Sequence, residues 1–489
     1  MLIDINPSSA ESLGIQIIRK IKEMIENGSL LPGTELPSSR KLAEKLGISR
    51  STVYHAYCEL QAMGYLRSKQ GSYNIVQKRK REVNYDPERA SVICWDKISS
   101  PNAQAAYSDF LEFSPKRNLP VRPENKLINL EGLVPDSRLF PITEFKRSMN
   151  YALQNTGAEG LVYGTVQGYL PLREYLAKRL RLHSISVSAD EILITNGAQQ
   201  AIDLILTFFA SAKISIAVES PTYSLFMPLL KLHQMKAVWI PMKSEGMDLD
   251  SLSKVLSEKK ADIVYTMPNF HNPTGITTSH QHRERLLQLC LKHNVPLIED
   301  GFEEDLKYFG KVDLPIKSLD EGNSVIYLGT FSKALFPGLR LGWIAASKEL
   351  TDRLTAIRRF TDLGTNHISQ IAMHFFCENG YYDMHLKKLY RIYRRRMEIA
   401  LKTMEACFPK SVSWTKPVGG YLIWVKMPKK LSKSDLCLLL DPFGIKVSSG
   451  TYYFPETRES EFFRISISAL NEEEIIKGIT SLGKALSRL

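Results

Sequence analysis

Residues 329–343 read Gly-Thr-Phe-Ser-Lys-Ala-Leu-Phe-Pro-Gly-Leu-Arg-Leu-Gly-Trp. The lysine, Lys333, follows a Thr-x-Ser pair made by Thr330 and Ser332. An arginine, Arg340, lies seven residues further on. An amine in an apolar wall can form a Schiff base, because burial keeps part of it unprotonated. Hydroxyls and a guanidinium bind phosphate. The stretch therefore predicts a site for an aldehyde cofactor that carries a phosphate, and the alternative is a buried strand end whose lysine reaches water.

Around this motif, short apolar stretches alternate with amphipathic ones from residue 126 to residue 489. This alternation predicts an α/β domain with a mostly parallel sheet. The predicted strands are 191–194, 214–218, 263–266, 295–298 and 325–328. Since ligands of such domains bind beyond the carboxyl ends of strands, candidate site residues are those that follow these stretches.

Two of these positions suit the phosphate and the ring of a cofactor. A Gly-led helix start follows strand 191–194, and its exposed N–H groups, on Ala198 and Gln199, are expected to bind phosphate. Tyr223 follows the next strand and can stack on an aromatic ring. A tyrosine of the core or the rim is the alternative.

Two further positions suit polar atoms of an aromatic ring. Asn272, before Pro-Thr-Gly, can donate to a phenolic oxygen, although Asn-Pro also forms Asx-turns. Asp300 ends a predicted strand, and a carboxylate there would keep a pyridine nitrogen protonated. A helix cap or a surface ion pair is the alternative for Asp300.

The first part of the chain, residues 8–77, has a different pattern. A helix is predicted over 13–27, a second short helix is capped by Ser38 or Ser39 and ends before Gly47, and a third is capped by Ser49 and runs to Met63. Two strands follow them. Two helices joined at Gly47 are typical of a helix-turn-helix, a motif that also occurs as a structural corner. Hydroxyls and an arginine at the start of the third helix suit contacts to DNA. The predicted DNA-binding residues are Arg40, Ser49, Arg50, Ser51, Thr52, Tyr54, His55 and Lys69.

The charge is spread unevenly along the sequence. The chain has a net charge of +12, and residues 1–81 hold 13 Lys and Arg against 7 Asp and Glu, a net charge of +6. A basic head on a more balanced body indicates a polyanion partner, although a solvated basic surface would look the same. Residues 78–125 have no clean periodicity and are predicted to form a linker with one short helix near 103–113.

Composition narrows the classes of protein that remain. Charges interrupt every apolar run, so no membrane span is expected, and the N-terminus lacks the order of a signal peptide. The six cysteines are scattered without a CxxC pair, which argues against zinc or a disulfide framework. We therefore expect a cytoplasmic protein without a bound metal.

These motifs resemble known families. Residues 31–57 carry Leu-Pro-Gly, Leu-Pro-Ser-Ser-Arg and Ser-Arg-Ser-Thr-Val, and so resemble the winged helix-turn-helix of GntR-family regulators. The motifs of the body resemble, in chain order, fold-type I aminotransferases that use pyridoxal phosphate. The whole chain resembles the MocR/GabR subfamily of GntR regulators. The resemblance implies an α+β winged head (8–77), a linker (78–125) and an α/β aminotransferase-like body (126–489). In that body a large domain of about 160–365 is completed by a smaller, largely C-terminal α/β domain.

The resemblance also implies roles for single residues. Lys333 would form the Schiff base, Asp300 would pair with the pyridine nitrogen, and Asn272 would bind the ring hydroxyl oxygen. Tyr223 would stack on the ring, and Arg464 would clamp the carboxylate of a ligand. Tyr163 would reach the phosphate site of the partner subunit in a homodimer. The phosphate cup would consist of Ala198, Gln199, Thr330, Ser332 and Arg340.

The sequence departs from the family at two places. The family usually has a tyrosine two residues after the aspartate, and this chain has Phe302, which cannot donate to the ring oxygen. The wing has Gly71-Ser72-Tyr73 where the family usually has Gly-x-Gly. The first departure predicts a Schiff base with a raised pKa.

The resemblance implies a transcription regulator that binds double-stranded DNA and senses an amino acid or related amine through pyridoxal phosphate. Two alternatives stay open, namely an active aminotransferase with an added DNA-binding domain and a DNA-binding protein whose body has lost the cofactor.

Overall fold

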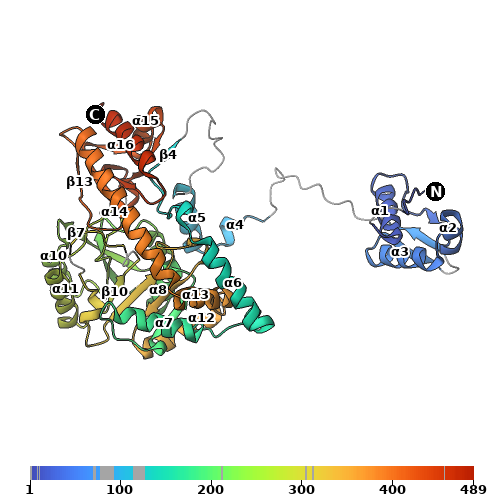
Figure 1. Ribbon diagram of the computed structural model, residues 1–489, viewed down its shortest axis with the longest axis horizontal. Helices are drawn as coiled ribbons and strands as arrows, with labels where there is room; N and C mark the ends of the chain where they lie inside the picture. Colours follow the sequence, from blue (N-terminus) through green and yellow to red (C-terminus); the bar gives the residue numbers. More distant parts are fainter. Residues whose placement is uncertain are drawn as a thin grey trace. The chain divides into compact units, whose positions relative to one another are not determined.

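The computed structural model describes residues 3–7, 9, 11–69, 73–77, 93–113, 127–210, 213–302, 306–310, 313–455 and 457–489. Contacts divide the chain into two compact units, Met1–Lys97 and Ile98–Leu489 (Figure 1). Each unit has its own hydrophobic core. We call the first unit the head and the second the body.

The winged part of the head is built on α1 (Leu13–Glu26), α2 (Ser39–Leu46) and α3 (Arg50–Ala62). The short α4 (Trp95–Ile98) lies at the boundary between the two units. Ser38 caps α2 by accepting from the Lys41 N–H at 3.3 Å, and Ser49 caps α3 by accepting from the Thr52 N–H at 3.2 Å. Gly47 lies between these helices with φ +65°, a left-handed conformation that glycine adopts without steric cost. The predicted helix-turn-helix is confirmed.

An antiparallel sheet completes the head. Its strands β1 (Glu35–Leu36), β3 (Tyr73–Val76) and β2 (Leu66–Lys69) lie in the order β1-β3-β2. The wing strands β2 and β3 were predicted from the sequence, but β1 was not. Two residues are too few to show the alternation by which a strand is recognised.

The body is built on an eight-stranded sheet in the order β5-β12-β11-β10-β9-β6-β7-β8. Neighbouring strands from β11 to β7 run parallel, whereas β12 and β8 are antiparallel to their neighbours, so the predicted mostly parallel sheet is confirmed. The strands are β5 (Ile192–Thr195), β6 (Ser215–Ser220), β7 (Lys236–Lys243), β8 (Gly246–Met247), β9 (Ile263–Thr266), β10 (Leu297–Asp300), β11 (Val325–Thr330) and β12 (Gly342–Ala345).

Helices cover the sheet. Every residue of β5, β9, β10 and β11 is buried, as expected for strands that are covered on both faces. The helices of this part of the body are α6 (Ile142–Thr156), α7 (Leu170–Arg181), α8 (Ala198–Phe209), α9 (Phe226–Leu232), α10 (Leu249–Ser257), α11 (His280–Lys292), α12 (Lys348–Thr361) and α13 (His367–Glu378).

A smaller four-stranded sheet, in the order β13-β14-β17-β16, lies next in the body. Its strands are antiparallel, namely β13 (Ser413–Trp414), β14 (Leu422–Ser432), β16 (Ser448–Ser449) and β17 (Glu459–Ser466). The long helix α14 (Tyr381–Cys407) packs against α16 (Glu472–Leu486), and α15 (Lys433–Leu440) follows β14. In addition, β4 (Ile128–Asn129) pairs in parallel with β15 (Ile445–Lys446), so residues before the large sheet join the small domain.

The helix predicted inside the linker is present as α5 (Pro101–Phe113). It packs against α9 of the body and belongs to the second unit. The bounds of the linker and of the domains stay predictions. The basic tetrad 78–81 and the wing tip 70–72 lie outside the described residues.

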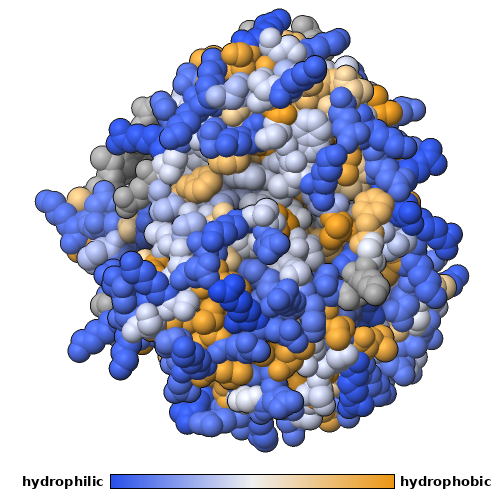
Figure 2. Space-filling view, turned by 90° about the vertical axis from the view of Figure 1, so that its left-hand side faces the viewer, coloured by the Kyte–Doolittle hydropathy of each residue, from blue (hydrophilic) through white to orange (hydrophobic). Residues whose placement is uncertain are grey.

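The surface of the body is mainly hydrophilic on the face that Figure 2 shows, where hydrophobic residues form separate patches around a central hollow. Among the helices of the described ranges, none combines the length and the apolar character that crossing a membrane requires.

Candidate functional site

A cavity of about 280 Å³ opens beyond the carboxyl ends of the parallel strands. Nine of the predicted site residues line it, namely Ala198, Gln199, Tyr223, Asn272, Asp300, Thr330, Ser332, Lys333 and Arg340. They come from separate stretches of sequence that the fold brings together. The remaining lining residues are mostly apolar and include Leu133, Leu225 and Phe302.

Asp300 supplies a buried carboxylate at the end of β10. Its Oδ2 accepts from the Tyr265 hydroxyl at 2.8 Å, whereas its Oδ1 is buried and has no hydrogen-bond partner among the described residues. Burial raises the pKa of this carboxyl from 3.8 to about 6, although the hydrogen bond from Tyr265 and the positive charge of Lys333 oppose the shift. An unpartnered, buried carboxylate oxygen on a cavity suits a cationic N–H group, such as a protonated pyridine.

Lys333 follows β11 in the turn between Thr330 and β12. Its Nζ donates to the Leu133 carbonyl at 3.1 Å. Its own carbonyl accepts from the Tyr421 hydroxyl at 2.7 Å, and His385 Nε2 lies 2.9 Å from the next carbonyl, that of Ala334. Burial lowers the pKa of His385 to about 4, so the neutral ring donates this bond at pH 7. These two side chains hold the lysine backbone in place.

The phosphate cup lies where α8 begins. Gly197 has φ +81°, and a Cβ at this position would lie 2.8 Å from Arg340 Nη2. Only glycine therefore lets the guanidinium approach, and Arg340 Nη2 donates to the Asn196 carbonyl at 2.9 Å. The Thr330 and Ser332 hydroxyls lie 3.1 Å apart on the same cavity. N–H groups at a helix start, hydroxyls and a guanidinium together suit a phosphate.

A carboxylate that the sequence did not reveal supports this cup. Asp362 Oδ2 accepts from the Asn196 amide at 2.7 Å and also from the Gln200 amide. Asp362 Oδ1 accepts from Arg358 Nε at 3.0 Å, and the Arg358 side chain is fully buried. Asp362 thus holds the loop that leads into α8, at Asn196, and the first turn of α8, at Gln200. More than 160 residues separate it from that loop, so no local pattern marks it.

Arg464, on β17, contacts Asn272, a residue that lines the cavity, but does not line the cavity itself. Its Nη1 donates to Asn272 Oδ1 at 2.9 Å, and its Nη2 donates to the Glu131 carbonyl at 2.6 Å. Its Nε is buried without a hydrogen-bond acceptor in the part of the chain that the structure describes. The guanidinium lies 5.3 Å from the centre of the Tyr453 ring, a cation–π contact. The site therefore offers a buried cation with unused donor capacity.

The segment 131–138 links Lys333, which follows β11 of the large sheet, to Arg464 on β17 of the smaller sheet and to α14. The carbonyls of Glu131 and Leu133 accept from these two side chains. Asp136 anchors the segment further on, because its Oδ2 accepts from Arg396 at 2.8 Å and its backbone N–H donates to the Tyr393 hydroxyl at 3.2 Å.

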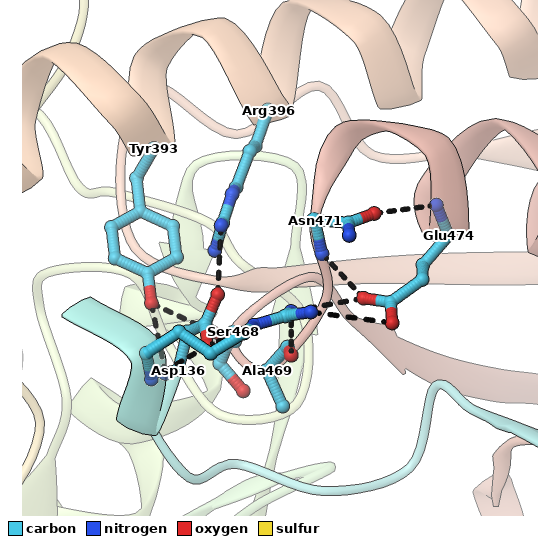
Figure 3. A network of polar contacts seen from close by, with 8 residues as sticks. Asp136, Tyr393, Arg396, Ser468, Ala469, Asn471 and Glu474 are labelled. Atoms are coloured by element: carbon cyan, nitrogen blue, oxygen red, sulfur yellow. Dashed lines mark hydrogen bonds and ion pairs between the residues drawn. The ribbon is translucent and has the colours of Figure 1, made fainter.

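Figure 3 shows how this anchor continues into α16. Arg138 donates to Asp136 Oδ1 at 2.7 Å and to both carboxylate oxygens of Glu474. The Arg138 and Arg396 guanidinium groups hold the pKa of the Asp136 carboxyl below its usual value, against the effect of burial. No local pattern marks this network, because its members lie up to 336 residues apart.

Tyr163 is not part of the cavity in the single chain. It is 87% exposed and follows two other exposed apolar residues in the chain, Leu161 and Val162. An exposed apolar cluster of this kind is typical of a protein interface.

The predicted DNA-contacting residues lie mostly on the surface of the head. Arg40, Ser49, Arg50, Ser51, Tyr54 and His55 are exposed, and Thr52 is partly buried. Arg40 pairs with Glu44 at 3.3 Å, and the Ser49 hydroxyl lies 2.9 Å from that of Thr52. The side chain of Lys69 lies outside the described residues.

The fold and the cavity define a fold-type I body of the pyridoxal phosphate class, joined to a winged helix-turn-helix. The model of aminotransferase class I and II matches residues 132–482, and the model of bacterial regulatory proteins, gntR family, matches residues 13–73. The chain belongs to the aminotransferase class I and II family and, over its whole length, to the MocR type of GntR regulators. The predicted family, cofactor and fold class are thereby confirmed.

Three proteins illustrate the likeness. The uncharacterized HTH-type transcriptional regulator YdfD of Bacillus subtilis is 31% identical over 97% of this chain and 96% of its own length. Aromatic-amino-acid aminotransferase 1 of Thermococcus litoralis is 36% identical over 74% of this chain and 88% of its own. The structure of LysN, an α-aminoadipate aminotransferase of Thermus thermophilus complexed with N-(5'-phosphopyridoxyl)-L-leucine, has 28% identity and a TM-score of 0.73, and covers 81% of this chain and 99% of LysN. The fusion of head and body makes this chain a DNA-binding regulator.

Proposed function

We propose that the chain is a pyridoxal phosphate-dependent transcription regulator whose body senses an amino acid or a related amine. The observation that carries this proposal is the cavity itself, where Lys333, an unpartnered Asp300 oxygen and a phosphate cup lie together beside a buried Arg464. Each of these groups suits a different part of the cofactor or of an amino acid bound to it.

The residues of the cavity fit the cofactor. The N–H groups of Ala198 and Gln199, with Thr330, Ser332 and Arg340, would hold its phosphate. Tyr223 would lie on the ring, and its hydroxyl donates to Gln199 Oε1 at 3.0 Å, which keeps the side chain in place. When bound, pyridoxal phosphate supplies an aldehyde carbon that amines attack and a ring that withdraws electrons.

The chain's own groups provide selectivity and proton control. Lys333 supplies an amine that an incoming amine can replace, and its contact with the Leu133 carbonyl places it at the cavity wall. Arg464 presents a planar fork to a carboxylate. Asp300 carries a charge that rises as the pH passes about 6, and this charge favours a protonated ring nitrogen. An α-amino acid thus meets an amine-exchange position and a carboxylate clamp in one site.

The proposal includes two macromolecular partners. Double-stranded DNA would bind the exposed N-terminal end of α3, where Arg50 offers a positive charge. A second copy of the chain would cover the apolar cluster around Tyr163 and bring that tyrosine to the neighbouring phosphate cup. Such a homodimer would present two heads to DNA, and a regulator of this kind acts in the cytoplasm.

The visible absorbance of the purified protein tests the proposal. The wild-type protein with pyridoxal phosphate should show a visible band that selected amino acids shift. After borohydride reduction, mass spectrometry should find the cofactor on Lys333. The Lys333→Ala variant should lack the covalent label, and Lys348→Ala, which removes an exposed lysine, should keep it. A wild-type protein that stays unlabelled would refute the proposal.

A second candidate function is aminotransferase activity. It is favoured by the 36% identity to an aromatic-amino-acid aminotransferase and by the presence in the cavity of the predicted catalytic residues Lys333 and Asp300. Sustained turnover of an amino acid with a keto acid acceptor would establish this activity. Slow, single conversion of the bound cofactor would favour the sensor.

A further inference from the structure

The helix α5 lies between the head and the rest of the body in the order of the chain. It begins at Pro101, shortly after the head ends at Lys97, and it packs against α9. A signal that travels along the chain from the cavity to the head must pass through this helix. Contacts between α5 and the cavity would therefore link the ligand to the head.

The contact between α5 and α9, which we call the dock, includes two polar interactions. Asp109 Oδ1 lies 3.1 Å from Lys231 Nζ, and Asp109 is only 9% exposed. Asn102 Nδ2 donates to the Leu232 carbonyl at 3.0 Å. Both partners lie in the last turn of α9. Two polar contacts to one short helix hold α5 along this side.

The other sides of α5 are open. Tyr107, Phe110 and Leu111 are each more than half exposed, and a groove of about 1250 Å³ runs beside Asp109. An isolated helix of 13 residues is marginal in water, so α5 depends on its dock for its structure. An element with few buried contacts belongs to the part of a protein that opens first.

The start of α9 belongs to the cofactor site. Leu225, its N-cap residue, lines the cavity, and Tyr223 precedes it by two residues. The Phe226 ring stacks on Tyr265 with centroids 4.0 Å apart, and the Tyr265 hydroxyl donates to Asp300. One short helix thus contacts the cavity at its first turn and α5 at its last.

A second contact joins this loop to the carboxylate clamp. The Thr222 N–H donates to the Tyr453 carbonyl at 3.0 Å, and the Tyr453 ring lies under Arg464. The neighbouring residues Tyr452 and Phe454 line the groove beside α5. A ligand that engages Tyr223 and Arg464 therefore acts on the loop before α9 from two sides.

We propose that the docking of α5 on α9 is the regulated contact, so that an amino acid bound in the cavity changes the stability of the dock and thereby the state of the head. This inference rests on the proposed function. It requires the ligand to bind the docked and undocked forms with different affinity, and linkage then makes the effect reciprocal. A change at the dock must alter ligand affinity although Asp109 does not line the cavity.

Hydrogen exchange of the full-length chain tests the inference. The probes are pyridoxal phosphate and N-(5'-phosphopyridoxyl)-L-leucine, each added to the cofactor-free protein. We expect the leucine adduct to change amide exchange within 101–113 by at least about fivefold relative to pyridoxal phosphate, the lower end of usual coupling. Peptides of α16 should not respond.

Two variants sharpen the test. Asp109→Asn and Asn102→Ala should each speed exchange in α5, reduce its response to the adduct, and change the affinity for the adduct by at most the factor by which the adduct changes docking in the wild type. Asp352→Asn, which breaks an exposed ion pair with Lys348 at 2.7 Å, is the matched control and should change none of these.

The possible outcomes separate the two proposals. Tight binding of the adduct with unchanged α5 exchange would overturn the inference and leave the sensor intact. Failure of the adduct to bind the cofactor-free protein would overturn the proposed function and, with it, this inference. A response of α5 that survives in both dock variants would also reject the dock as the regulated contact.

Discussion

The head and the body present their polar groups in opposite ways. On α3 of the head, Arg50 is exposed and the hydroxyls of Ser49 and Thr52 bond to each other. In the body, Asp300 and Arg464 are buried and each keeps a polar atom without a partner in the described chain. A buried group without a partner is costly, so it indicates the chemistry of a group that would bind there. An exposed polar group forms hydrogen bonds with water, so it does not indicate the chemistry of a particular ligand.

The largest expected change in ligand affinity concerns Arg464. Arg464→Lys keeps the positive charge but removes the planar fork, so affinity for N-(5'-phosphopyridoxyl)-L-leucine should fall about 100-fold, or ~2.7 kcal/mol. Affinity for pyridoxal phosphate alone, which has no α-carboxylate, should change by less than about threefold. Fluorescence titration of the cofactor-free protein measures both constants.

The control for this prediction is Arg458→Lys, which changes an exposed arginine of the same domain. It should leave both constants unchanged. Equal losses for the two ligands in Arg464→Lys would mean that Arg464 supports the cavity and does not bind a carboxylate. The contrast between buried and exposed groups would then lose its strongest example.

A pH dependence of stability is expected from Asp300. Its folded pKa of about 6 lies above the unfolded value of 3.8, so the stability it contributes is present below pH 3.8 and lost as the pH rises through 6. The full loss is about 3 kcal/mol, of which about 1.4 kcal/mol falls between pH 5 and pH 8. Urea unfolding of the cofactor-free protein should show this loss in the wild type.

Asp300→Asn removes the titrating group and should remove that part of the pH dependence. Asp203→Asn, at a half-exposed carboxylate that bonds His233, is a suitable comparison and should keep it. Identical stability profiles for the wild type and Asp300→Asn would contradict the burial argument. The variant isolates the cost of a site that is built to receive a cation.

The sequence was sufficient for the fold and for the groups that line the cofactor cavity. Lys333, Asp300 and Asn272 each follow a strand or sit in a distinctive local motif, and parallel strands bring such positions to one edge. The winged head was equally readable, because caps and the turn at Gly47 are local signals. In both units, the features that could be predicted are those that depend on residues close together in the sequence.

The supporting groups could not be predicted, because they act across long sequence separations. Asp362, Tyr421 and the Asp136–Arg396 pair contact residues 88 to 260 positions away, and each looks like an ordinary surface or core residue in isolation. The docking of α5 was hidden for the same reason. Its helix was predicted, but a segment of mixed composition showed no sign of a partner.

A smaller effect is expected in the head. Arg50→Ala removes an exposed charge at the start of α3, so affinity for DNA upstream of its own gene should fall about fivefold, with a salt slope smaller by about 1. A mobility-shift assay at two salt concentrations measures both. Arg19→Ala, at an α1 arginine paired with Glu11 at 3.0 Å, is the control. Equal affinities for wild type and Arg50→Ala would show that the start of α3 does not contact the DNA.

The smallest expected effect concerns Phe302, which is 7% exposed and lines the cavity without offering a donor. In Phe302→Tyr, a phenol would donate to the ring oxygen of the cofactor and stabilise its negative charge. The pH at which the visible band of the loaded protein titrates should therefore fall, by at least about half a pKa unit or ~0.7 kcal/mol. Phe336→Tyr, at a ring outside the cavity, should leave the titration unchanged.

An unchanged or higher midpoint in Phe302→Tyr would show that position 302 does not reach the ring oxygen. A lower midpoint would show that the wild-type cavity lacks a hydrogen-bond donor to the ring oxygen at position 302. The lack of this donor suits a site for binding more than a site for turnover.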